Sequence, residues 1–177
     1  MSNPTWLNLA LIAVLLLTCA FDLARRRIPN RLLAFGLLTA LVMHLASGNP
    51  SSLLSIYLAG FAVGMVMFLP LYLAGGMAAG DVKLMATVGA FVGPTLAFQS
   101  SLATYCAGGV LALVIVLARR RGRAAFANIG LLLQPMLMRL NRVPVTEAPP
   151  TPPSVGGMPY ALAITAGTLV VLWLHHT

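Results

Sequence analysis

Two aspartates carry most of the chemical information in this sequence. Asp22 and Asp81 are its only aspartates, and Glu147 is its only other carboxylate. Each aspartate stands where a long apolar segment meets polar or glycine residues. An ionisable side chain beside the hydrocarbon of a membrane is costly to keep there. Two carboxylates that share a proton can activate water against an amide, so the pair predicts a hydrolytic site.

The composition predicts a membrane protein. Of the 177 residues, 59% are hydrophobic and 8% are charged, and the mean hydropathy is +0.93. A soluble domain carries roughly 25% charged residues, so polar side chains are too few here to cover a water-soluble globule. We therefore expect one membrane-embedded domain over residues 1–177. No Lys or Arg precedes the first apolar run, so we expect no cleaved signal peptide.

The net charge of +8 does not indicate nucleic-acid binding. The basic residues flank apolar segments instead of lining one helical face. Such flanks are typical of the positive-inside rule and of attraction to anionic lipids, which we expect as partners. Cys19 and Cys106 fall inside apolar runs and form no CxxC pair, so no metal site is expected. No cofactor is expected either, because the sequence contains no phosphate-binding loop.

Six apolar segments are predicted to cross the membrane as helices. They cover residues 6–24, 32–46, 53–74, 82–98, 102–118 and 159–174. We expect Pro70 to break the third segment, and a polar turn around residues 99–101 to join the fourth and fifth. Gly60 with Gly64, and Gly89 with Gly93, are expected to permit close helix packing. The fold class is therefore an all-α polytopic membrane protein with six transmembrane helices.

The positive charges set the predicted orientation. With six spans, every Lys and Arg falls on one side of the membrane, which the positive-inside rule makes cytoplasmic. The N-terminus and the C-terminus then face the periplasmic side. This topology brings Asp22, at the inner end of the first segment, and Asp81, at the inner start of the fourth, to one face.

One sizeable cytoplasmic stretch, residues 124–157, separates the fifth and sixth segments. Residues 126–140 are apolar and are expected to form a helix at the membrane interface, with a re-entrant segment as the alternative. A Pro-rich linker is expected to follow in extended form and without a core of its own.

Two motifs resemble those of the type IV prepilin peptidases, which are GxGD-type intramembrane aspartic peptidases. The first motif is FDLARRRIPNRL, residues 21–32, and the second is GGMAAGDVKL, residues 75–84. A late MPYALAI, residues 158–164, is similar to the Pro-Tyr at the start of the family's last helix. The motif order is most similar to the short subgroup that serves tight-adherence (Flp) pili. Ala78 departs from the pattern, because the family has a glycine there.

The resemblance implies a prepilin leader peptidase of the bacterial inner membrane, with Asp22 and Asp81 as its catalytic pair. Its substrate would be a prepilin with a short basic leader and a hydrophobic helix. Cleavage would fall on the cytoplasmic side, just before that helix. One carboxylate would be ionised and act as base, and the other would be protonated and act as acid. The sequence leaves open which aspartate has which role.

Residues beside the second aspartate are further candidates for the substrate site or its loop. Gly80 would let the backbone approach an extended substrate closely. Lys83 follows Asp81 by two positions and so points away from it on a helix. We expect Lys83 either to reach lipid headgroups or to meet the substrate.

The other candidates lie near the first motif and at the start of the last helix. Asn30 is expected either to cap the second helix or to bind the substrate backbone. Pro29 is expected to shape the preceding turn. Pro159 and Tyr160 belong to the late Pro-Tyr motif, and Tyr160 has the alternative role of an interfacial anchor.

Two other functions stay open on the sequence alone. A small transporter or proton-relay component would use the aspartates along a pathway, although such acids are expected at mid-membrane and not at one edge. For the aspartates themselves, the alternative to a catalytic role is that each only pairs with Arg or Lys at the interface. An inactive scaffold of the same fold is the second alternative function. The alanine at position 78 keeps that alternative open.

Overall fold

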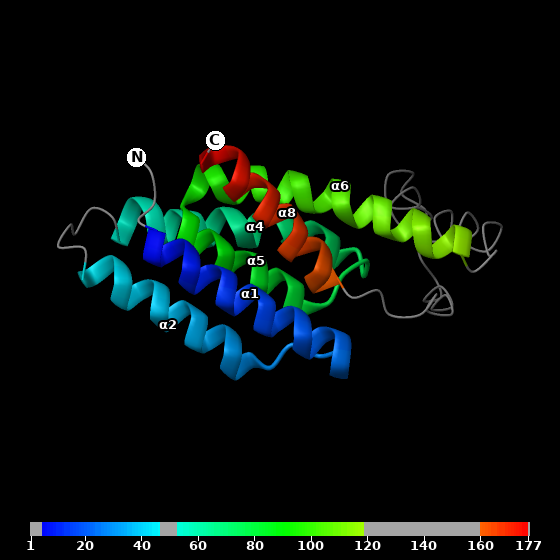
Figure 1. Cartoon of the computed structure of the whole chain (residues 1–177), viewed down its shortest axis with the longest axis horizontal. Helices are drawn as coiled ribbons and strands as arrows, with labels where there is room; N and C mark the ends of the chain where they lie inside the picture. The colour runs from blue at the N-terminus through cyan, green and yellow to red at the C-terminus, as the bar shows by residue number, and fades with distance from the viewer. Residues whose placement is uncertain (1–4, 47–52, 119–159, 177) are drawn as a thin grey trace, which may run out of the picture. The chain divides into compact units, whose positions relative to one another are not determined.

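The computed structural model describes residues 5–46, 53–118 and 160–176, and within them every regular element is a helix (Figure 1). An all-α fold is therefore confirmed for this part of the chain. The elements are α1 (Thr5–Arg25), α2 (Asn30–Ala46), the π-helix η1 (Leu53–Leu58), α4 (Ala59–Leu73), α5 (Ala79–Val92), α6 (Pro94–Ala118) and α8 (Tyr160–His176).

The chain divides into two compact units. The first contains Met1–Gly109 and Pro159–Thr177, and the second is Val110–Met158. All packing described below belongs to the first unit. The expected interfacial helix and the Pro-rich linker, residues 124–157, lie outside the described residues, and so does Pro159.

Helix α5 is the central helix of the first unit. Eleven of its fourteen residues are buried, including Asp81. It packs against α1, α2, η1, α4 and α8, several of which run beside it in Figure 1. A side chain at the start of α5 is thus surrounded by protein on several sides, which matters for the aspartate there.

The tightest packing joins α4 to α5. A Cβ atom built on Gly60 would overlap the backbone of Gly89, and one on Gly64 would overlap the carbonyl of Met85. The backbones of the two helices therefore touch at positions where any larger residue would push them apart. The expected close packing at Gly60, Gly64 and Gly89 is confirmed.

The break between the fourth and fifth predicted segments lies at Gly93, so the polar turn expected at residues 99–101 is wrong. Gly93 has a φ of 84°, a left-handed value that favours glycine. Helix α6 starts directly afterwards at Pro94, where a missing N–H costs no helical hydrogen bond. Within α6 the Ser101 hydroxyl donates to the Ala97 carbonyl at 2.8 Å. Such bonds to the preceding turn let polar residues stay inside the helix.

The expected break at Pro70 is also wrong, because α4 continues past this proline. The helix ends instead in a Schellman motif. The Gly76 N–H donates to the Leu71 carbonyl and the Gly75 N–H donates to the Tyr72 carbonyl, both at 2.9 Å. Gly75 has the left-handed φ of 75° that this motif needs. The motif turns the chain within a few residues towards Asp81.

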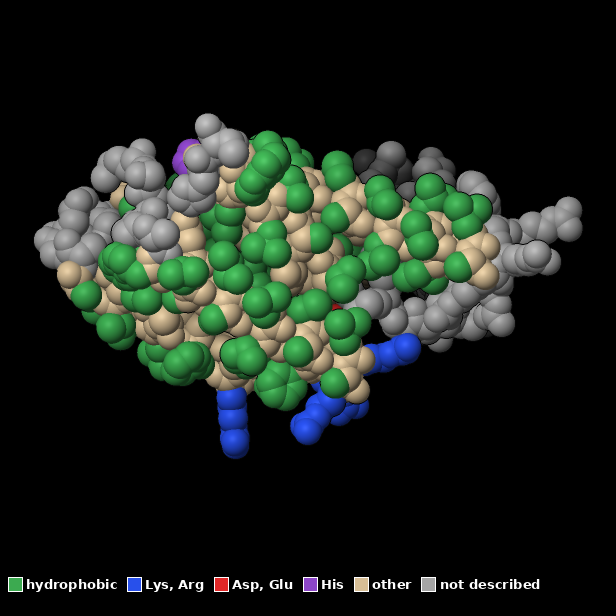
Figure 2. All heavy atoms as spheres, viewed as in Figure 1, with side chains coloured by type: hydrophobic (Ala, Val, Ile, Leu, Met, Phe, Trp, Pro, Cys, Tyr) green, Lys and Arg blue, Asp and Glu red, His purple; other side chains and the backbone are tan. Residues whose placement is uncertain are grey.

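Three helical stretches are long and apolar enough to cross a membrane: Trp6–Arg25, Leu53–Leu73 and Pro94–Ile115. Asn30–Ala46 and Tyr160–His175 are shorter apolar helices. Figure 2 shows one face that is largely hydrophobic, with Lys and Arg side chains projecting from one edge. This distribution is typical of helices whose apolar sides face lipid and whose charged ends face water.

Candidate active site

Asp22 lies in the last turn of α1. The helix ends at Arg25, and the next residue, Arg26, has a left-handed φ of 51°. The Arg26 N–H donates to the Asp22 main-chain carbonyl at 2.8 Å, which completes the final helical turn. The Asp22 side chain is half-buried. Its Oδ2 atom accepts a hydrogen bond of 3.3 Å from the backbone N–H of Ala161, in the first turn of α8.

Asp81 lies in the first turn of α5 and is only 6% exposed. Its N–H donates to the carbonyl of Ala78, the N-cap residue, at 3.1 Å. Ala78 has φ −82° and ψ 149°, an extended conformation that any residue adopts. The alanine at the family's glycine position therefore fits this backbone without strain.

The two aspartates interact electrostatically. Asp81 precedes the apolar stretch that begins at Val82. Burial raises the pKa of Asp81 to about 6, and the neighbouring Asp22 carboxylate adds to the rise, while a hydrogen bond with the Ala78 backbone opposes it. Helices α1 and α5 pack against each other. The structure thus brings together the two carboxylates that are 59 positions apart in the chain.

Tyr160, the first residue of α8, lies within electrostatic reach of Asp81. Its ring makes an edge-to-face contact with Phe68, at 6.3 Å between centroids. Phe68 in turn stacks on Tyr105 at 5.1 Å, and the Tyr105 hydroxyl donates to the Met67 carbonyl. No pattern in the sequence singles out Phe68 or Tyr105, because an aromatic residue in an apolar helix usually only packs.

Comparison with known protein families gives one match. Residues 9–113 match the type IV leader peptidase family. The chain belongs to this family. No curated protein and no solved structure matches the chain. The matched region contains both aspartates. The family indicates a protease that resembles the type IV leader peptidases. The structure adds helices that are long and apolar enough to cross a membrane.

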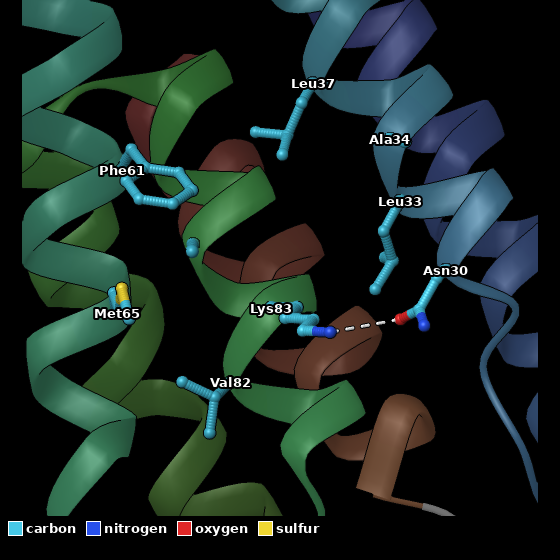
Figure 3. A pocket seen from close by; sticks show the side chains of 9 residues that line it. Asn30, Leu33, Ala34, Leu37, Phe61, Met65, Val82 and Lys83 are labelled. Atoms are coloured by element: carbon cyan, nitrogen blue, oxygen red, sulfur yellow. Dashed lines mark hydrogen bonds between the residues drawn. The ribbon is translucent and has the colours of Figure 1, made fainter.

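In this peptidase, Lys83 and Asn30 bind each other. The Lys83 Nζ donates to Asn30 Oδ1 at 3.2 Å (Figure 3). Asn30 is the first residue of α2, so the N-cap position belongs to Pro29. The Pro29 carbonyl accepts the N–H of Leu32 at 3.0 Å and so starts the helix. Asn30 therefore does not cap α2, which was one of the two roles expected for it.

The Lys83–Asn30 pair lies at an apolar groove of about 510 Å³ between α2, α4 and α5 (Figure 3). Neither aspartate lines this groove. The lining residues are Asn30, Leu33, Ala34, Leu37, Phe61, Met65, Val82, Lys83 and Ala86.

Gly80 lies inside the first turn of α5, and its φ is not in the left-handed region. A Cβ atom at this position would lie 3.4 Å from the Cβ of Ile28, an ordinary van der Waals distance. Neither backbone conformation nor packing therefore requires a glycine here. The left-handed glycine of this connection is Gly75, five residues earlier.

Proposed function

We propose that this protein is a leader peptidase for Flp-type prepilins and that Asp22 and Asp81 form its catalytic dyad. Membership of the type IV leader peptidase family supports a peptidase. The observation that carries the dyad is the effect of the Asp22 carboxylate on the pKa of Asp81. A carboxylate is harder to ionise beside a second one, so Asp81 keeps its proton to a higher pH than an ordinary aspartate.

The proposed reaction is the hydrolysis of one peptide bond. The ionised aspartate takes a proton from a water molecule as the water oxygen attacks the carbonyl carbon of the peptide bond. The protonated aspartate then gives its proton to the leaving nitrogen as the carbon–nitrogen bond breaks. The products are the free leader, with a new carboxyl end, and the mature pilin with a new amino end. No group outside the protein, the substrate and water is needed.

The substrate that suits this site is a prepilin with a short basic leader and a hydrophobic helix. We place cleavage at the cytoplasmic face of the bacterial inner membrane, with six spans and both termini in the periplasm. The described basic residues support this orientation, because Arg25, Arg26, Arg27 and Arg31 follow Asp22, and Lys83 follows Asp81. Anionic lipids on that face are the second proposed partner.

A proton-relay component or transporter is less well supported. A relay needs acids along a pathway through the membrane, whereas Asp22 lies in the last turn of α1 and Asp81 in the first turn of α5. The inactive scaffold also loses its support, because Ala78 adopts an ordinary extended conformation.

The test is leader removal from a co-expressed Flp-type prepilin, followed by mobility on a gel. Asp22→Asn and Asp81→Asn should each abolish cleavage while the protein still inserts at parental abundance. Asp→Glu at either position should lose about 100-fold, because a ~1 Å misplacement is enough to cost that much. Glu147→Gln, at the only other carboxylate, is the matched control and should cleave normally. Near-normal cleavage by either Asn variant would exclude the dyad.

A further inference from the structure

The first turn of α8 binds one member of the proposed dyad and lies within electrostatic reach of the other. The Ala161 N–H donates to Asp22 Oδ2 at 3.3 Å. The preceding residue, Tyr160, lies within electrostatic reach of Asp81. Residues 139 positions apart in the chain thus meet at the site. The family match ends at residue 113, well before this turn.

A backbone N–H in the first turn of a helix has no carbonyl partner within that helix. Its hydrogen bond to a carboxylate favours the ionised carboxylate, and the positive end of the helix dipole acts in the same direction. Asp22 therefore has a main-chain donor from a different helix, and its side chain is half-buried. Asp81, in contrast, is 6% exposed, and burial disfavours its charged form.

We propose that the first turn of α8 is a positioning element, in which the Ala161 N–H fixes the orientation of the Asp22 carboxylate so that Asp22 acts as the base and Asp81 as the proton donor. This inference rests on the proposed dyad and assigns a role to each of its members. It also gives a reason for a helix that the matched region does not include. Ala161 itself touches no reacting atom and acts only through Asp22.

Packing holds this turn in place. The Tyr160 ring contacts Phe68 of α4. The Tyr160 hydroxyl lies close to Gly108 of α6, because a Cβ atom added to Gly108 would come within 2.8 Å of that hydroxyl. Further along α8, a Cβ atom on Gly167 would come within 2.6 Å of the Thr104 nitrogen, so α8 lies directly against α6 at that point. Ala161 is fully buried. The donor is therefore fixed by contacts on both sides of its helix.

The ionisable groups around Asp22 are few among the described residues. Cys19 on α1 and Asp81 on α5 interact with it. On α8, Tyr160 interacts with Asp81 and with Tyr105 of α6. The arginines after α1 are exposed to solvent. Among the described residues, the Ala161 N–H donates the hydrogen bond that the Asp22 carboxylate accepts.

The deciding variant is Ala161→Pro, because proline removes the N–H and is tolerated in a first helical turn. We expect kcat for leader cleavage to fall about tenfold or more, with KM within about threefold. Leu162→Pro is the matched control, because it places the same ring one position later and keeps the Ala161 N–H. The control variant should keep the parental kcat and KM within about threefold.

A folded Ala161→Pro enzyme with the parental kcat, or with a loss that lies in KM alone, would overturn the inference. A second measurement covers a variant that fails to fold. In the Glu147→Gln background, infrared spectroscopy at about pH 5 should show one protonated carboxyl band, which Asp81→Asn removes and Asp22→Asn keeps. If both Asn variants are inactive but the band disappears in Asp22→Asn and persists in Asp81→Asn, the assignment of the two roles is wrong, although the dyad itself stands. Cleavage by Asp22→Asn would instead refute the proposed function itself.

Discussion

Lys83 donates a hydrogen bond of 3.2 Å to Asn30, and this bond joins the two sequence motifs of the peptidase. Asn30 is the first residue of α2, eight positions after Asp22, and Lys83 lies two positions after Asp81. The bond therefore links the start of α2, which follows the helix of Asp22, to the start of α5, which carries Asp81. Such an exposed pair contributes little to stability but can restrict the two motifs relative to each other.

Removing either partner of this pair should have the same small effect. Lys83→Met and Asn30→Ala should each lower the midpoint of thermal unfolding slightly, and the double variant should lower it no further, because the bond is already lost in each single variant. Unfolding in detergent is the measurement. Arg31→Met, which removes an exposed cation from the residue after Asn30, is the control. Additive losses in the double variant would show that the two side chains act independently.

Asp81 should make the stability of the protein depend on pH. Its pKa in the folded protein is about 6, above the ordinary 3.8. The folded state therefore keeps a proton that the unfolded state releases, so this contribution to stability falls as pH rises through that window and is constant above about pH 7. We expect a loss of ~3 kcal/mol in the free energy of unfolding across the window.

Denaturant unfolding in detergent between about pH 4 and pH 7 measures this loss. Asp81→Asn should remove the dependence, since its side chain does not titrate. Glu147→Gln should retain it. An Asp81→Asn protein with the parental pH dependence would assign the effect to another group.

The contact between α4 and α5 should tolerate no added methyl group. Gly60→Ala places its Cβ atom against the backbone of Gly89, which has no flexible end that could move aside. We expect a loss of ~1–3 kcal/mol or failure to accumulate. Gly109→Ala is the matched control, because a Cβ atom there meets nothing within 4 Å. Membrane abundance and the unfolding midpoint are the readouts, and equal stability of the two variants would contradict the observed packing.

The connection before Asp81 should respond differently to two single-methyl changes. Ala78→Gly should leave cleavage within about threefold, because the φ of −82° needs no glycine. Gly75→Ala has open space around its new Cβ atom, yet its left-handed φ of 75° should cost about 1 kcal/mol. Cleavage rates and unfolding midpoints of both variants test this. A large gain in rate for Ala78→Gly would mean that the active loop differs from the observed one.

Cysteine labelling tests the proposed orientation in a variant without Cys19 and Cys106. The six-span topology predicts that some single cysteines react with a membrane-impermeant reagent from the periplasm and others do not. The reactive positions should be Ser2, Gly48 and Thr177, and the protected positions should be Arg121 and Ser154. Labelling of a cysteine at Arg121 from the periplasm would contradict the orientation predicted from the positive charges. It would also contradict the proposal that the two aspartates lie at one face of the membrane.

The sequence alone predicted the helical class and the position of most helices, because apolar runs of this length form helices wherever lipid surrounds them. The first segment was predicted at residues 6–24, and α1 covers Thr5–Arg25. The placement of Asp22 near the end of one helix and Asp81 near the start of another followed from the same local pattern. The six-span topology and the periplasmic termini stay predictions.

Turns inside apolar sequence were harder to locate. Ser101 and its neighbours suggested a loop, but the Ser101 hydroxyl donates to the Ala97 carbonyl in the preceding turn and α6 runs through this stretch. The actual break is at Gly93, where the backbone needs a left-handed φ. Polarity alone does not distinguish these cases, because a hydroxyl can be satisfied inside a helix or outside it.

The environment of each aspartate was decided only by the tertiary structure. Burial of Asp81 results from the central place of α5, which depends on how five other elements pack around it. The partner of Asp22 is the main-chain N–H of Ala161, and every non-proline residue carries such a group, so no residue type marks it in the sequence. The sequence therefore identified the two carboxylates, whereas only the packing of α1, α5 and α8 made their surroundings different.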